Sequence, residues 1–264
     1  MIRVYRALLL AQLQVAAQYR LSMFLYLLFS IMRPVIFLAA WSAVALARGG
    51  SVNGFTPADF AAYYVILTVV QHLVTAWNQY DFELQVRMGQ LSPRLVRPLD
   101  PIHYAIAENI IWKSFTFVGI LPVLAVIVIT YGVQFHFALW QIALFIPSLL
   151  LAASLQFLIS WAIASSAFWT TRTHAVSSLF DRTSFIFAGQ IAPLSLLPGV
   201  LQQVAYVLPF GYIFGVPTDI LRGGHDLPTS LVLMGGQAVW VAIAFVASRI
   251  VWRFGVRAYT AVGA

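Results

Sequence analysis

Side chains capable of catalysis or metal binding are few in this chain, and their spacing matches no catalytic motif. There are five histidines, eight acidic residues and no cysteine among 264 residues. The histidines lie at positions 72, 103, 136, 174 and 225, without the H-E-x-x-H spacing that holds zinc. No G-x-x-x-x-G-K-[ST] loop is present to hold a triphosphate, and no G-x-S-x-G elbow to expose a serine nucleophile. We therefore expect no catalytic residue, no metal site and no cofactor on this chain.

The most polar part of the chain is the stretch DFELQVRMGQLSPRLVRPLDP, residues 81–101. At 100° per residue, one helix face would carry Leu84, Met88, Leu91 and Leu95, and the other Glu83, Arg87, Gln90, Arg94 and Arg97. Gly89 can end a first short helix, and Ser92 with Pro93 can begin a second. The pattern predicts a structured cytosolic loop. Two roles stay open: a helix lying at the membrane interface, or a docking element for a soluble partner.

Several polar residues fall inside or beside apolar segments. Arg33 would cost roughly 2.5–3.5 kcal/mol at the centre of a span, so it should pair, face water or snorkel to an interface. Gln71 and His72 could line a pathway, although a lone histidine more often bonds a neighbouring helix. We expect Glu108 and Lys113 to be interfacial and solvated, because the apolar run after them is long enough to span by itself.

Membrane helices must position these residues. The chain is 61% hydrophobic and 9% charged, with a mean hydropathy of +0.88, whereas roughly 25% of residues are charged in soluble domains. We predict a single all-α transmembrane domain over 1–264 with six crossings. The expected segments are an amphipathic interface helix over 1–20 and crossings over 21–47, 58–80, 104–131, 138–168, from about 183, and 231–251.

Prolines interrupt the fifth apolar segment and would break an ordinary spanning helix. They predict a re-entrant helical hairpin over 193–224 at the outer side, where protein or water covers the broken backbone. An outer loop with buried apolar residues is the alternative. The tryptophans at positions 161, 169, 240 and 252 fit aromatic belts at the two membrane interfaces.

The arginines fall mostly on one side of the predicted crossings. With the N-terminus inside, the cytoplasmic segments hold Arg3, Arg6, Arg20, Arg87, Arg94, Arg97, Arg172, Arg182, Arg249, Arg253 and Arg257, and the outer segments hold Arg48 and Arg222. By the positive-inside rule, both termini are expected in the cytoplasm of a bacterial cell, with the protein in the inner (plasma) membrane. Since topology accounts for the basic residues, we expect no nucleic-acid partner.

Three stretches together resemble the permease subunits of ABC-2-type transporters, the membrane-spanning subunits of ABC exporters. They are Asp81 followed by GQLSPRLVRPLDP, the segment GQIAPLSLLPGVLQQVAYVLPFGYIFGVPTDILRGG from Gly189 to Gly224, and the ending GVRAYTAVGA. The similarity covers nearly the whole chain in order and spacing.

The resemblance implies that residues 81–101 form a coupling loop seated in a groove of a nucleotide-binding subunit. The coupling residues would be Asp81, Glu83, Arg87, Met88, Leu91, Arg94, Leu95 and Arg97. Two permeases, identical or related, would enclose a pathway within membrane lipid, and separate ATPase subunits would bind ATP and Mg²⁺. The outer gate would be formed by Pro193, Pro198, Pro209 and Phe210.

An ion-coupled secondary transporter is the alternative function. It calls for a deep carboxylate or an inverted repeat, and neither is clear in the sequence. A scaffold without transport activity has no positive signal. The resemblance leaves the cargo open among lipids, hydrophobic drugs and peptides.

Overall fold

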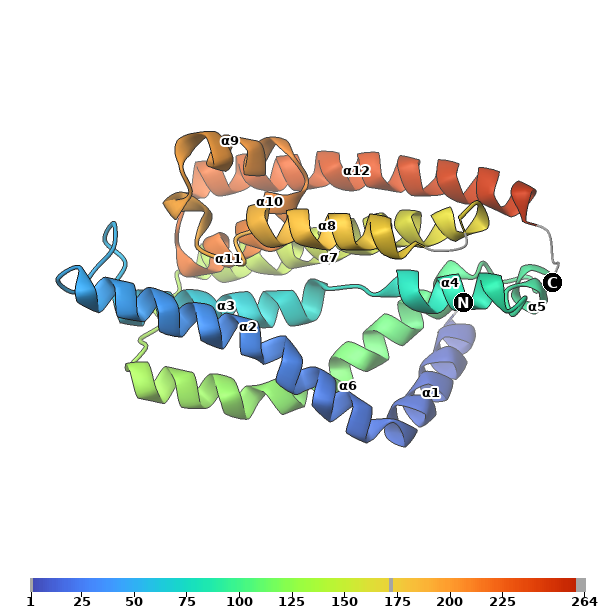
Figure 1. Cartoon of the computed structure of the whole chain (residues 1–264), viewed down its shortest axis with the longest axis horizontal. Helices are drawn as coiled ribbons and strands as arrows, with labels where there is room; N and C mark the ends of the chain where they lie inside the picture. Colours follow the sequence, from blue (N-terminus) through green and yellow to red (C-terminus); the bar gives the residue numbers. More distant parts are fainter. Residues whose placement is uncertain (1, 171–172, 260–264) are drawn as a thin grey trace.

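Long apolar runs become long helices, because in hydrocarbon each backbone group must be bonded within its own segment. The computed structural model describes residues 2–170 and 173–259. Its helices are α1 (Ile2–Gln18), α2 (Arg20–Ala47), α3 (Pro57–Val74), α4 (Asn78–Arg87), α5 (Ser92–Leu95), α6 (Ile102–Tyr131), α7 (Leu139–Ser165), α8 (His174–Phe187), α9 (Gly199–Val207), α10 (Phe210–Ile213), α11 (Gly215–Arg222) and α12 (Leu227–Ala258) (Figure 1). No β-strand occurs in these described ranges, which confirms the all-α prediction.

Five helical segments are long and apolar enough to cross a membrane. They are Ser30–Ala47, Pro57–Arg87, Ile102–Tyr131, Leu139–Phe168 and Leu227–Ala258. Two of them begin where the sequence supplies a cap. Thr56 and Asp59 form a capping box before α3, and Asp226 accepts the backbone N–H of Thr229 at the start of α12. Hydrogen bonds from the Thr229 hydroxyl and backbone hold the pKa of Asp226 below its ordinary value.

The remaining predicted crossing corresponds to α8, and its expected start near Thr183 was wrong. The helix begins at His174 and ends at Phe187, so it has 14 residues, which is about 21 Å at 1.5 Å per residue. That length is shorter than a hydrocarbon core of about 30 Å. The start was misplaced because crossings were located by continuous apolar runs. Residues 177–184 include polar side chains and form part of an amphipathic helix, which has no such run. A sixth complete crossing stays a prediction.

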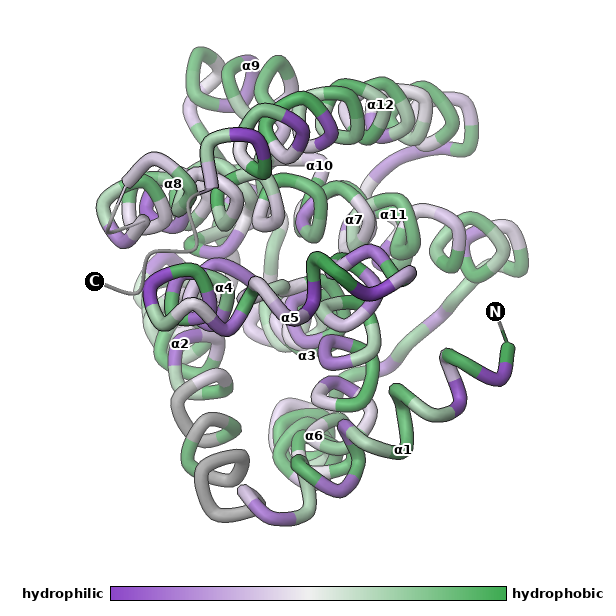
Figure 2. Tube along the Cα trace, turned by 90° about the vertical axis from the view of Figure 1, so that its right-hand side faces the viewer, coloured by the Kyte–Doolittle hydropathy of each residue, from purple (hydrophilic) through white to green (hydrophobic). Residues whose placement is uncertain are grey.

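Both termini lie at the same end of the bundle as α4 and α5 (Figure 1). Figure 2 looks along the bundle from this side, and α1, α4 and α5 show mixed hydrophilic and hydrophobic segments. The N-terminal helix α1 turns away from α2 and packs along α6, where the Tyr5 hydroxyl lies 2.7 Å from His103 Nδ1.

The core of the bundle is α3, which packs against α2, α6, α7 and α11. Phe60, Tyr63, Tyr64 and Leu67 on this helix are at most 1% exposed. Because α3 is buried on several sides, its middle turns carry few polar residues. Each neighbouring helix therefore packs against apolar side chains of α3.

After α8 the chain breaks into short helices, as the prolines predict. The irregular backbone at Gly189 and Ile191 is covered by protein. Tyr63 donates to the Gly189 carbonyl at 2.6 Å, and the Ile191 carbonyl accepts from the Tyr64 hydroxyl at 2.6 Å and from Trp41 Nε1 at 2.8 Å. These bonds satisfy backbone oxygens that lipid could not.

Candidate functional site

The three predicted pathway residues border one cavity, which we call the central cavity. It has a volume of about 540 Å³. Arg33 reaches it from α2, and Gln71 and His72 reach it from α3. The cavity also collects Gln156 from α7 and Asp181 from α8. Sequence reasoning missed both of these, although Asp181 is an acidic residue in the same polar stretch that masks α8.

Arg33 is exposed on the flank of the single chain rather than buried within the bundle. Its guanidinium carbon lies 5.6 Å from the centroid of the Phe185 ring on α8, within the range of a cation–π contact. Asp181, one turn before Phe185, is also exposed. Two opposite charges therefore stand on neighbouring helices at the edge of the central cavity.

His72 is held between helices by hydrogen bonds. Its Nε2 lies 3.0 Å from the Lys113 carbonyl oxygen and 3.2 Å from the Thr116 hydroxyl, both on α6. Lys113 in turn donates through Nζ to the Val74 carbonyl at 3.4 Å. This places a positive charge at the C-terminal end of α3, where the helix dipole favours it.

A break in the second spanning segment lies directly beyond these contacts. Residues 75–77 are not helical, and they separate α3 from α4. A second cavity of about 270 Å³, which we call the side cavity, lies at this break. His72, Thr75 and Trp77 border both cavities.

Glu108 and Lys113 also line the side cavity, and their position at a membrane interface stays a prediction. Both are only partly exposed, because the open space at the helix break gives their polar groups a place inside the protein. Asp81, at the other wall, brings a second carboxyl group to the same cavity.

The predicted coupling loop is folded as two short helices joined by a turn. Gly89 adopts φ +68° and ends the first helical stretch, as expected from the sequence. The prediction of one apolar face was wrong, because a wheel of 100° per residue does not continue through this turn. Met88 is 61% exposed and Leu84 44%, whereas Leu91 is fully buried.

The charged residues of the loop divide into outward and inward groups. Asp81, Arg87 and Arg97 are exposed. Arg94 turns inward: it donates to Gln85 Oε1 at 2.8 Å and lies over the Tyr104 ring at 5.0 Å.

Glu83 ties the loop to the start of α8. Its carboxylate accepts from the Thr173 backbone N–H at 2.8 Å and from the Thr173 hydroxyl at 2.7 Å. The same residue lies 3.6 Å from Arg87, one turn ahead on α4. Arg172, which precedes Thr173 and was predicted to be cytoplasmic, lies outside the described residues.

An aromatic cluster fixes the loop to the bundle. Phe82 of α4 packs against Trp161 of α7 at 5.1 Å, Phe168 at 5.6 Å and Trp252 of α12 at 5.8 Å between ring centroids. Trp161 and Trp252 are 3% and 8% exposed, so assigning them to an aromatic belt in lipid was wrong. The loop supplies the Phe82 ring that covers them.

The four predicted outer-gate residues lie before or at the start of the short helices that follow α8. Pro193 is buried and Pro198 is exposed. Pro209 precedes α10, and Phe210 contacts Phe180 and Phe187 of α8, with ring centroids 5.6 and 6.5 Å away. These contacts join the hairpin to α8.

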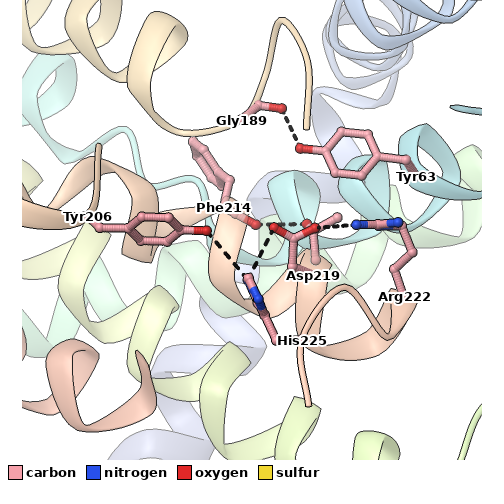
Figure 3. Close-up of polar contacts among 8 residues, drawn as sticks. Tyr63, Gly189, Tyr206, Phe214, Asp219, Arg222 and His225 are labelled. Carbon is pink, nitrogen blue, oxygen red and sulfur yellow. Dashed lines mark hydrogen bonds and ion pairs between the residues drawn. The ribbon is translucent and has the colours of Figure 1, made fainter. Parts of the chain in front are cut away.

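Sequence reasoning missed a buried ionic cluster beside this hairpin (Figure 3). Asp219, whose side chain is 3% exposed, pairs with Arg222 at 3.2 Å. His225 lies 3.9 Å from the other carboxylate oxygen, and the Tyr206 hydroxyl lies 3.4 Å from His225 Nε2. Arg222 also stacks over Phe55 at 4.8 Å. The signal was the run TDILRGGHD, which places both charges close together after apolar residues.

The geometry is that of a helical bundle with a cavity open on one flank, a folded polar loop at one end and short, partly buried helices at the other. The described residues contain no group of three or more His, Cys, Asp or Glu side chains that could hold a metal ion. A comparison with curated proteins gave no match. The family model described as ABC-2 family transporter protein matches residues 22–263. The chain thus belongs to the ABC-2 transporter family, as a membrane transport subunit rather than a catalytic one.

Proposed function

We propose that the chain is the permease subunit of an ATP-driven exporter and that separate ATPase subunits dock on α4 and α5. Family membership supports the export subunit. In this proposal, ATP binding closes the ATPases, the docked loop moves with them, and the crossings rearrange to release cargo outside. ATP and Mg²⁺ are bound by the partner subunits.

The observation that carries the docking proposal is the exposed surface of the loop. Arg87 and Arg97 stand on it beside Met88, which is 61% exposed, and Val96, which is 84% exposed. Apolar and arginine side chains side by side are the composition that protein interfaces favour. The alternative is a loop that only lies on the membrane surface with its arginines on lipid phosphates. Such a loop would turn these apolar side chains into the lipid.

The loop is attached firmly enough to act as a lever. Phe82 and Leu91 bury their side chains in the aromatic cluster, Glu83 is bonded to Thr173, and Arg249 of α12 lies 3.3 Å from Asp100. A displacement of the loop would therefore displace α7 and α12.

A second permease copy would cover the open flank of the central cavity. Arg33 and Asp181 are exposed there on the single chain. A charged side chain facing hydrocarbon costs about 2.5–3.5 kcal/mol even on insertion scales. A dimer that places this flank against a second subunit, with water between them, would remove that cost and enclose a shared pathway.

Orientation follows from charge. Arg3, Arg6, Arg87, Arg97, Arg253 and Arg257 belong to the helices and loops of the end that holds both termini. By the positive-inside rule this end is cytoplasmic, where soluble ATPase subunits can reach α4 and α5.

The test is co-purification of the chain with ABC ATPase subunits of its own cell. We expect the wild-type chain to retain the ATPase, and the double variant Arg87→Glu, Arg97→Glu to lose it while eluting as a folded protein. Arg48→Glu reverses one charge on an exposed arginine at the opposite end, and it is the matched control for the single variants Arg87→Glu and Arg97→Glu, which are measured beside the double variant. Retention of the ATPase by the double variant would overturn docking on this surface.

The rival function, ion-coupled secondary transport, has one structural observation in its favour: Asp81 and Glu108 both line the side cavity. The exporter proposal predicts that transport in vesicles stops without ATP, and that a proton or sodium gradient alone does not drive it. Gradient-driven transport in the absence of ATP would favour the rival.

A further inference from the structure

Four glutamines, together with serine and threonine hydroxyls, belong to the polar lining of the central cavity. Gln71 comes from α3, Gln79 from α4, Gln156 from α7 and Gln190 from the loop after α8. Ligand pockets are lined mostly by apolar side chains with a few polar groups, and in this cavity more of the polar groups are amides and hydroxyls than charged groups. Each amide presents both a donor and an acceptor.

Part of this hydrogen-bonding capacity is unused. Gln156 is 5% exposed, and its Oε1 has no hydrogen-bond partner. Its neighbour Gln79 differs, because its Oε1 accepts from the Ser160 hydroxyl. A buried carbonyl without a partner among the described residues is costly. This oxygen is not in contact with the open space of the cavity, so the hydroxyl of an occupant would reach it only after the Gln156 side chain rotates toward the cavity.

The charges of the cavity cancel. Arg33 and Asp181 bring one charge of each sign, and the His72 ring is engaged with α6. A phosphate or carboxylate requires donors and excess positive charge, and an ammonium requires acceptors and excess negative charge. Groups that both donate and accept, such as hydroxyls, match amides best.

The lining also includes the aromatic rings of Trp77, Tyr80, Phe185 and Phe214. Trp77 and Tyr80 border the cavity, and their ring centroids are 6.4 Å apart. The side chains are 48% and 46% exposed. An aromatic ring offers an apolar face on which the C–H groups of a saturated, hydroxyl-bearing ring can pack. The neighbouring amides can then hydrogen-bond the hydroxyls of that ring.

From these features we propose that the central cavity binds a neutral, hydroxyl-rich group of the cargo, with the chemistry of a sugar. The proposal rests on the proposed function, in which this cavity belongs to the export pathway. It narrows the cargo to one that presents a polar, uncharged group at membrane depth.

The absence of cysteine allows a direct test. Ser30→Cys places a single thiol on the wall of the central cavity, and Val126→Cys places one on α6, where the side chain is 62% exposed on the apolar surface. The full chain is reconstituted in phosphatidylcholine nanodiscs, free of sugar detergents. A charged, water-soluble methanethiosulfonate reagent is then applied alone or with maltotriose, tetraethylammonium or inorganic phosphate.

We expect Ser30→Cys to react and Val126→Cys to stay unreactive. Maltotriose should slow the reaction in proportion to 1 + [L]/Kd, about tenfold when it is present at ten times its Kd. Tetraethylammonium and phosphate should leave the rate unchanged. Adding Gln156→Leu should remove the protection, whereas Gln203→Leu, at an exposed position on α9, should preserve it. If Gln156→Leu does not elute as a folded protein, Gln71→Leu takes its place.

An unreactive Ser30→Cys would overturn the inference, because the cavity would then be closed to water. Protection by a charged solute, or by none of the three, would overturn the sugar-like chemistry, as would protection that survives Gln156→Leu. ATPase co-purification is measured separately, so failure here leaves the docking proposal standing. Loss of docking alone would leave the binding chemistry of the cavity intact.

Discussion

The short helices at the two ends of the bundle differ in whether their charged side chains are exposed or buried. At the end with both termini, α4 buries the aromatic ring of Phe82 and exposes Arg87, and Arg97 is exposed just after α5. At the other end, α11 buries Asp219 and pairs it with the partly buried Arg222. Charge displayed at the surface is available to another subunit, whereas charge neutralised inside holds a segment in place. The end that holds α4 and α5 is therefore suited to binding another subunit, and the end that holds α11 is suited to closure.

Removing one member of the outer ion pair should have the largest effect. Arg222→Met leaves Asp219 buried with only His225 nearby, so we expect a loss of about 3–5 kcal/mol in the free energy of unfolding. Denaturant unfolding in detergent, followed by tryptophan fluorescence, measures it. Arg48→Met at an exposed site is the control and should shift the value by less than about 0.5 kcal/mol. Equal stabilities for the two variants would show that the outer charges are not held by burial.

Crowding the aromatic cluster at the inner end should have the next largest effect. A Cβ atom on Gly255 would stand 2.2 Å from the Phe168 ring, so Gly255→Ala should cost about 1–3 kcal/mol by overpacking. Gly235, on the same helix, has no atom within 4 Å of such a Cβ. Gly235→Ala should therefore be neutral or stabilising by up to about 1 kcal/mol. The same unfolding assay compares them, and matching values would mean that the cluster is loosely packed.

A smaller effect is expected at the contact between α5 and the residue after α12. The Ser92 and Tyr259 hydroxyls lie 3.0 Å apart, and one such bond contributes about 0.5–1.5 kcal/mol. Tyr259→Phe should lower stability by that amount and increase the rate of proteolysis within residues 88–98. Limited proteolysis with mass spectrometry checks this, with Tyr131→Phe at the opposite end as the control. An unchanged cleavage rate would show that other contacts hold α5.

The smallest stability change belongs to the exposed arginines of the loop. Arg97→Ala removes a solvated charge, so the free energy of unfolding should change by less than about 0.5 kcal/mol. Binding of the ATPase should nevertheless weaken. A combined stability and pull-down measurement separates the two outcomes. A large loss of stability would mean that Arg97, like Arg94, has an internal role.

The sequence predicted the features that depend on local chemistry. The capped start of α3, the turn at Gly89 and the broken backbone after α8 each follow from residues that stand next to one another. The polarity of Arg33 and His72 inside apolar segments was equally visible, but their meeting at one cavity was not, because it depends on how α2 and α3 cross.

Contacts between distant segments explain the errors. Trp161 and Trp252 have the composition of a lipid belt, and only the packing of Phe82 over them turns them inward. In the sequence, Asp219 and Arg222 have the composition of a loop. They become buried and partly buried, respectively, because α11 packs beside α3. In both cases burial is decided by a third segment, which periodicity within one segment cannot reveal.

The non-helical residues 75–77 have a consequence for timing. A continuous helix from 57 to 87 would transmit any tilt of its inner end along an unbroken ladder of hydrogen bonds to its outer end. The interruption removes that ladder at one level, so α4 can rotate while α3 keeps its bonds to Gly189 and Ile191. In the proposed exporter, the two ends of the pathway would then open one after the other, which would prevent leakage during a transport cycle.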